Sequence, residues 1–111
     1  MARIHALGDF EQLVVLAILR LEAKAFAPDI RRAIETAANR PVSRGALYAT
    51  LDRLEAKGLL AWRPEPGSSV RAGIPRRRFW VTAAGLRAVK RSYRAVATLA
   101  RGLEGRLGSA S

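Results

Sequence analysis

The chain has 111 residues, half of them hydrophobic, and it contains no cysteine. This length fits one domain with a single small core, and the lack of thiols excludes disulfides, thiolate metal sites and cysteine nucleophiles. Lysine and arginine outnumber aspartate and glutamate by 20 to 9, which gives a net charge of +11.

The positive charge is concentrated in the second half of the chain. Residues 1–56 hold eight basic and seven acidic side chains, whereas residues 57–111 hold twelve basic and two acidic ones. A charge distribution of this kind suits a polyanion, and nucleic acid is the expected one. Charge alone leaves an anionic membrane surface or an acidic protein open as partners.

The sequence indicates neither a membrane protein nor an enzyme. The longest apolar run, residues 13–19, is too short to cross a bilayer, and no signal peptide precedes it. One histidine and scattered carboxylates form no acid–base or metal-binding constellation, so we expect no catalytic residue, metal or cofactor. We expect a cytoplasmic protein that has no membrane partner.

The first predicted helix begins at Asp9, a suitable N-cap, and carries Glu11 in its first turn. Hydrophobic residues then recur at helical spacing and leave almost no polar face. They are Phe10, Leu13, Val14, Val15, Leu16, Ala17, Ile18, Leu19 and Leu21. A helix of this kind either lies at the centre of the fold or meets a second chain.

A helix-turn-helix is predicted next. A turn over residues 24–27 leads to Pro28, whose fixed φ suits the start of a second helix, and residues 39–41 end that helix. The third helix begins after Ser43, whose hydroxyl can cap it, and ends before Gly58, which can adopt the left-handed conformation. Helix pairs of this kind also occur in structural bundles, so the surface of the third helix decides its interpretation.

The outward side of the third helix consists mainly of small residues, while Leu47, Leu51 and Leu54 share the core-facing side. Such a helix can lie close to the floor of the DNA major groove, with flanking donors on phosphates or base edges. The expected DNA contacts on this helix are Ser43, Arg44, Gly45, Tyr48 and Arg53. The alternative is an ordinary solvent-exposed face.

Two short strands, over residues 59–63 and 76–82, flank a loop rich in proline, glycine and serine. A two-stranded hairpin is unstable alone, so it must pack on the helices. Its tip is strongly basic, and three consecutive arginines repel one another unless an anion is bound. The hairpin is therefore a predicted wing that contacts phosphates or a minor groove through Arg71, Arg76, Arg77 and Arg78. The alternative is a solubilising loop.

Thr82 caps a last predicted helix over residues 83–108. Its hydrophobic residues step by three and four in an unbroken coiled-coil pattern over about three heptads. A helix this long cannot bury that seam in so small a domain, so we expect two chains to associate through it and the first helix. The predicted dimer contacts are Phe10, Val14, Leu86, Val89, Tyr93, Val96, Ala100 and Leu103. The basic outer face of the helix is open to a second interpretation, direct binding of membrane or nucleic acid.

These elements predict a mainly α fold with a small β-hairpin: a winged helix-turn-helix over residues 1–82 and a dimerisation helix over residues 83–108, in one compact unit. Four aromatic residues have spacings that permit a pocket near the dimer interface for a small apolar or aromatic effector. They are Phe10, Phe26, Trp62 and Tyr93. Aromatic residues at such spacings also serve as core.

Three segments resemble the PadR family of bacterial transcriptional regulators. They are GDFE over residues 8–11, VSRGALYATLDRLEAKGL over 42–59 and PRRRFWVTAAG over 75–85. The resemblance implies a winged helix-turn-helix that dimerises through a C-terminal helix packed with the N-terminal one. It also implies a repressor of a nearby operon, relieved by a small molecule or another signal, of the short subfamily with a single C-terminal helix.

The predicted function is sequence-specific regulation of transcription by a homodimer bound to double-stranded DNA. A symmetric dimer presents its recognition helices to major grooves roughly one helical turn (about 34 Å) apart, which requires an inverted-repeat operator. Two other classes stay open: a nonspecific nucleoid-type or RNA-binding basic protein, and a monomeric module whose seam binds another protein.

Overall fold

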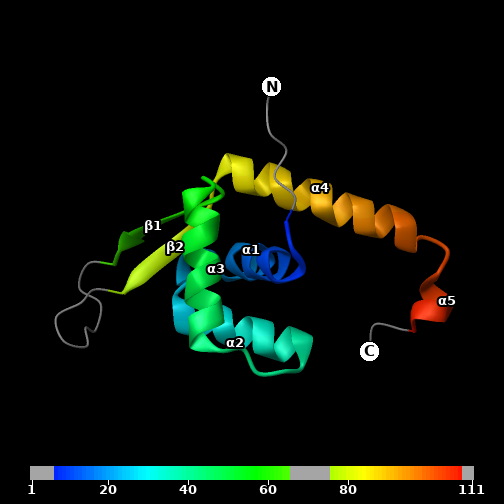
Figure 1. Cartoon of the computed structure of the whole chain (residues 1–111), viewed down its shortest axis with the longest axis horizontal. Helices are drawn as coiled ribbons and strands as arrows, with labels where there is room; N and C mark the ends of the chain where they lie inside the picture. The colour runs from blue at the N-terminus through cyan, green and yellow to red at the C-terminus, as the bar shows by residue number, and fades with distance from the viewer. Residues whose placement is uncertain (1–6, 66–75, 109–111) are drawn as a thin grey trace.

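The computed structural model describes residues 7–65 and 76–108, which form helices and one two-stranded antiparallel sheet (Figure 1). The elements follow in the order α1 (Asp9–Leu21), a 3-10 turn η1 (Glu22–Lys24), α2 (Ala27–Ala38), α3 (Arg44–Ala56), β1 (Leu60–Pro64), β2 (Arg77–Val81), α4 (Ala83–Ala100) and α5 (Glu104–Leu107). The mainly α fold with a β-hairpin wing is confirmed. None of the described helices is long and apolar enough to span a membrane.

Helix α1 forms the centre of the core, in keeping with its nearly continuous hydrophobic surface. Val14, Val15 and Ile18 are fully buried, and the helix packs against α2, α3, β2 and α4. In Figure 1, α1 lies in the middle of the molecule, with α4 above it and α2 below. Burial of such branched aliphatic side chains contributes about 1.5–3 kcal/mol each. Leu16 and Leu19 remain exposed on the outer side of the helix.

Two predicted dimer contacts lie inside this core, which corrects their assignment. Val14 on α1 and Val89 on α4 are 0% and 3% exposed within the single chain. Both follow the period of an apolar stripe, and the period alone does not distinguish a seam between chains from a core within one. The predicted cap of α1 was also wrong. Gly8, not Asp9, is the N-cap, and its N–H donates to the Glu11 carboxylate at 2.9 Å.

Helix α3 has the ends that its sequence predicts. The Ser43 hydroxyl accepts a hydrogen bond from the Ala46 N–H at 3.0 Å and so satisfies an otherwise unpaired amide of the first turn. At the other end Gly58 has a φ of 76°, a left-handed conformation that glycine adopts without a Cβ clash. The inward side of the helix is buried through Leu47, Thr50, Leu51 and Leu54.

Strands β1 and β2 form a hairpin that is anchored on the turn before α2. Trp62 on β1 pairs with Phe79 on β2. The Phe79 N–H donates to the Ala25 carbonyl at 2.9 Å, so β2 is bonded on both of its edges. Phe79 is buried, and the hairpin therefore packs on the helices as expected. Residues 66–75, including the predicted contact Arg71, lie outside the described residues.

Thr82 caps α4 and ties it to the end of α3. Its hydroxyl accepts from the Gly85 N–H at 3.1 Å and donates to the Gly58 carbonyl at 2.7 Å. Gly85 lies so close to the Leu59 carbonyl that a Cβ at this position would collide with it. The start of α4 and the end of α3 are therefore held in fixed contact.

The C-terminal helix is shorter than predicted. Helix α4 ends at Ala100 and a turn leads into α5, so the continuous helix over residues 83–108 was wrong. Gly102 in the turn has a φ of 85°, which interrupts the helix although the leucine period continues. The arm (residues 90–107) extends away from the core in Figure 1. Its exposed large hydrophobic side chains are Tyr93, Val96, Leu99, Leu103 and Leu107.

Candidate nucleic-acid interface

The outward side of α3 is a shallow surface. A Cβ added at Gly45 would meet no atom within 4 Å, and the ring of Tyr48 is partly exposed, with 41% of that residue accessible. Small side chains between longer donors allow a grooved partner to approach the helix closely, and the major groove of DNA admits one α-helix. The exposed residues of this side are Arg44, Gly45, Tyr48, Ala49, Asp52, Arg53 and Ala56.

A groove of about 220 Å³ lies between α3 and the wing. Tyr48 contributes from α3, Phe79 from β2, and Pro28 from the start of α2. The complete lining is Phe26, Ala27, Pro28, Tyr48, Arg76, Arg77 and Phe79. A second, smaller groove adjoins it along Ala27, Pro28 and Tyr48 and reaches Arg44. The outward side of α3 and the wing are therefore parts of one continuous surface.

Two arginines of the wing are held by aromatic rings. The Arg76 guanidinium carbon lies 4.1 Å from the ring centroid of Phe26, and that of Arg77 lies 4.3 Å from Trp62. A cation–π contact orients the planar guanidinium while its N–H groups can still donate at their edge. Both arginines are exposed, so they present oriented donors beside α3.

Carboxylates balance part of the charge of the arginine triplet. Arg76 Nη2 lies 3.6 Å from Asp29 Oδ2, and Arg78 Nε lies 3.2 Å from Glu65 Oε2. The triplet therefore does not depend on a bound anion alone, because the chain supplies carboxylates and aromatic rings of its own. The carboxylate partner of Arg78 is Glu65, the residue that directly follows β1.

Arg53 belongs to an internal network at the edge of the α3 surface. Its Nε lies 3.2 Å from Glu11 Oε2, and its Nη2 donates to the Thr50 hydroxyl at 3.2 Å. Lys57 Nζ approaches the same Glu11 oxygen at 3.0 Å. Half of the Arg53 side chain (52%) stays exposed, so it borders the outward surface while its Nε is engaged within the chain.

The Glu11 carboxylate is electrostatically favoured in this network. Burial alone raises the pKa of Glu11, but hydrogen bonds from the Gly8 N–H, Lys57 and Arg53 outweigh it and leave the pKa below its ordinary value of 4.5. The folded chain therefore stabilises the ionised form of the Glu11 carboxylate. Glu11 is ionised at neutral pH and carries its negative charge into the core.

The sequence of this chain matches that of a known protein family. A family model described as the transcriptional regulator PadR-like family matches residues 15–91, more than half of the chain. The chain belongs to the PadR-like family. The resemblance noted in its sequence is thereby confirmed, and the fold of this family implies regulation of transcription through DNA binding. A search of curated proteins found no match.

Solved structures share the fold of this PadR-like chain. The PadR family transcriptional regulator from Eggerthella lenta is 27% identical, with a TM-score of 0.63 over 86% of this chain and 80% of that one. RosR from H. salinarum is 22% identical, with a TM-score of 0.70 over 90% and 83% of the two chains. A winged-helix DNA-binding protein from STIV is 14% identical, with a TM-score of 0.65 over 86% and 97%.

The predicted DNA contacts of the PadR-like chain fall into three groups. Arg44 and Tyr48 on α3 and Arg76 and Arg77 of the wing line the two adjoining grooves, with Gly45 open beside them. Three others have engaged polar groups: they are Ser43 in the cap, Arg53 with Glu11, and Arg78 with Glu65. Arg71, the last, lies outside the described residues. DNA binding by the individual residues stays a prediction.

The predicted aromatic pocket divides between two parts of the molecule. Phe26 and Trp62 lie under arginines at the wing, whereas Phe10 lies on α1 and Tyr93 is 60% exposed on the arm. The groove that contains Phe26 has Tyr48 and Phe79 as its other aromatic residues. A ligand site built from the four predicted residues stays a hypothesis about an assembled dimer.

Sequence reasoning missed the role of Glu11 and a hollow at the end of α4. Glu11 shares the buried side of α1 with Val14 and Ile18, and an acidic residue at that spacing is an available signal of a buried ion pair.

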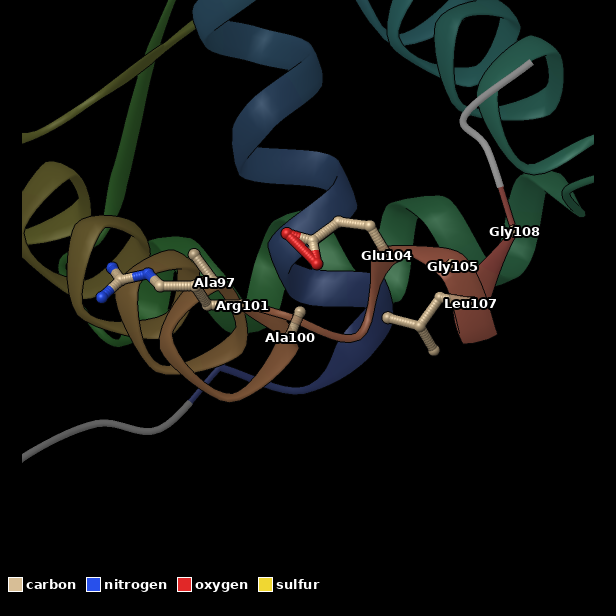
Figure 2. Close-up of a pocket in the computed structure, with 7 residues that line it drawn as sticks. All are labelled: Ala97, Ala100, Arg101, Glu104, Gly105, Leu107 and Gly108. Atoms are coloured by element: carbon tan, nitrogen blue, oxygen red, sulfur yellow. The ribbon is translucent and has the colours of Figure 1, made fainter.

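The open hollow between α4 and α5, of about 690 Å³, is shown in Figure 2. Its lining is Ala97, Ala100, Arg101, Glu104, Gly105, Leu107 and Gly108. Residues 7–65 and 76–108 contain no cluster of acidic residues or histidines suited to a metal ion.

Proposed function

We propose that this PadR-like protein is a sequence-specific repressor that binds an inverted-repeat operator as a homodimer. The observation that carries the proposal is one continuous surface. It is formed by the outward side of α3 and by the two wing arginines that stack on aromatic rings. A helix that is open for close approach suits base-edge contacts, and adjacent oriented guanidinium groups suit phosphates.

The roles of the contacts follow from their positions. Helix α3 is the recognition helix, in which Gly45 permits close approach while Arg44 and Tyr48 reach phosphates or base edges. Arg76 and Arg77 bind phosphates and supply affinity that is independent of sequence. With about six phosphates engaged per dimer, affinity falls about 1,000-fold between 50 and 200 mM salt.

Self-association of the chain is supported by the apolar surface of the arm. Val96 is 59% exposed and Leu99 79%, and monomeric proteins rarely expose a contiguous apolar patch of this kind. Leu16 and Leu19 on α1 offer a second exposed apolar surface on the same chain. In an isologous dimer, the arm of each chain can pack on α1 of the other chain. Both exposed apolar surfaces are then buried in each of the two chains.

Release by an effector completes the proposal. A small apolar or aromatic molecule that binds one spacing of the recognition helices better than the other shifts the dimer away from its operator. Tyr93 supports this role, since it is exposed on the arm within the proposed interface. Because its target is chromosomal DNA, we place the protein in the cytoplasm with the nucleoid.

The test is selection from a random duplex library, followed by titration of the enriched sequence and of random-sequence duplex at physiological salt. The proposal predicts an enriched inverted repeat that binds at least about 1,000-fold more tightly than random DNA. Tyr48→Ala is expected to reduce this preference while the protein stays folded. Equal affinities for both duplexes would instead support the nonspecific nucleoid-type protein, which the net charge of +11 also suits.

A further inference from the structure

Glu11 carries a charge inside the core of the chain. Its side chain is 8% exposed, on the side of α1 that also buries Val14 and Ile18. The Gly8 N–H donates to Oε1 at 2.9 Å, while Arg53 Nε at 3.2 Å and Lys57 Nζ at 3.0 Å approach Oε2. One carboxylate therefore links the start of α1 to two cations at the C-terminal end of α3.

The network continues along α3 toward its first turn. Arg53 Nη2 donates to the Thr50 hydroxyl at 3.2 Å, and that hydroxyl donates to the Ala46 carbonyl at 2.8 Å. Residues 46, 50, 53 and 57 are spaced by four, three and four, so they form one stripe along the helix. This stripe lies between the buried leucines of α3 and its exposed outward surface. It is therefore placed to fix the rotation of the helix about its own axis.

We propose that Glu11 is a positioning residue for DNA recognition. By holding Arg53 and Lys57, it sets the angle at which α3 presents its outward surface, and it keeps both cations from binding DNA phosphates regardless of sequence. This role rests on the proposed function, since it takes α3 as the recognition helix. Glu11 itself touches no DNA, because its carboxylate is buried beneath Arg53 and Lys57.

Removal of the Glu11 charge changes DNA binding in two ways. Helix α3 becomes free to rock, which weakens base-edge contacts that need exact placement. Arg53 and Lys57 become available to any phosphate, which strengthens binding to random DNA. Both effects lower discrimination between an operator and random DNA. An ion pair with a purely structural role lowers stability and leaves that discrimination unchanged.

The experiment compares Glu11→Gln with two matched controls in the full chain. Glu22→Gln removes the same charge from an exposed position just after α1, and Ile34→Val loosens the core without touching the network. Amide hydrogen exchange is measured in the free proteins, together with the dissociation constants for random-sequence duplex and for the duplex that the wild type selects. Lys57→Gln breaks one of the two ion pairs of Glu11 from the opposite side and serves for the exchange measurement if Glu11→Gln does not fold.

In Glu11→Gln we expect exchange in residues 44–56 to accelerate at least about tenfold more than in either control. We also expect the ratio of the two dissociation constants to fall about tenfold, within the usual range of coupling between sites. Behaviour identical to Glu22→Gln in both measurements would overturn the positioning role. If the wild type selects no sequence, sequence-specific regulation fails. The exchange data and tighter binding to random duplex then decide the role of Glu11 by themselves.

Discussion

A single carboxylate links the start of α1 to the end of α3, the proposed recognition helix of this PadR-like chain. Glu11 lies in the core with an amide and two cations around it, and these donors keep its pKa below the ordinary value of 4.5. A group whose pKa is lower in the folded than in the unfolded chain stabilises the fold above its unfolded pKa. That stabilisation disappears as the pH falls through the lowered value.

We therefore expect Glu11→Gln to lower the free energy of unfolding by about 1–3 kcal/mol at pH 7, because Arg53 and Lys57 lose the negative charge of their buried acceptor. The difference between wild type and variant should begin to shrink near pH 4.5, where the unfolded chain takes up the proton, and should vanish as the pH falls through the lowered pKa of the folded chain. Urea unfolding at several pH values measures both effects. A difference that stays constant down to about pH 2–3 would contradict this linkage.

Gly85 is a second position at which one residue decides a packing contact. A Cβ at Gly85 would collide with the Leu59 carbonyl and lie 2.8 Å from a methyl carbon of Val81. Gly85→Ala should therefore destabilise the fold by about 1–3 kcal/mol. Gly105→Ala is the matched control, because nothing lies within 4 Å of its added Cβ, and its effect should stay within about 0.5 kcal/mol. Equal melting temperatures for the two variants would contradict the close approach.

At the scale of elements, the wing presents charge through aromatic supports. Arg77 stacks on Trp62 across the hairpin, so its guanidinium is oriented before DNA arrives. Arg77→Gln is expected to weaken binding to selected and random duplexes alike. It should also reduce the slope of log affinity against log salt by about one unit for each phosphate that the variant no longer neutralises.

Arg63→Gln is the control for the wing. Arg63 has the same charge and a similar ring contact, with Trp80 at 5.2 Å, but it lies on β1 and does not line the groove beside α3. Its substitution should leave the salt slope nearly unchanged. A reduction of the slope by the same amount in both variants would show that the hairpin contributes only diffuse charge.

Elements fixed by local chemistry were predictable from the sequence, whereas contacts between distant residues were not. The caps at Ser43 and Thr82 and the left-handed Gly58 depend on neighbours within a few residues, and the structure has all three. Glu11 meets residues 42 and 46 positions away, and no periodicity indicates that pairing. The period of α4 predicted a longer helix because the hydrophobic spacing continues past Ala100, where the turn that contains Gly102 interrupts the helix.

The candidate site shows the same division. Small residues flanked by Arg44 and Tyr48 were sufficient to predict the exposed side of α3. The partners of Arg76 were not predictable, because Asp29 in α2 and Phe26 before it are brought to the wing only by the tertiary fold. Burial of Val89 was missed for a related reason, since a core stripe and a dimer seam have one period.

At the scale of the whole molecule, the arm is the surface through which we propose that two chains form a symmetric dimer. Val96→Asp places a charge in the exposed apolar surface and should convert the dimer to single chains of 12.1 kDa. Because two linked recognition helices bind far better than one, affinity for the selected repeat should fall about 100-fold or more. Thr98→Asp adds the same charge to an exposed position of α4 beside its basic residues and should leave the dimer intact. Dimers of Val96→Asp with wild-type affinity would contradict the assignment of the arm.

Light scattering of the wild-type protein bound to a duplex that carries its selected sequence tests the central claim most directly. The claim is that two chains, joined through their arms, place two α3 helices and two wings on one stretch of DNA. A mass of two chains per duplex is the predicted result. A single chain per duplex, or chains that accumulate along the DNA without a fixed number, would contradict it.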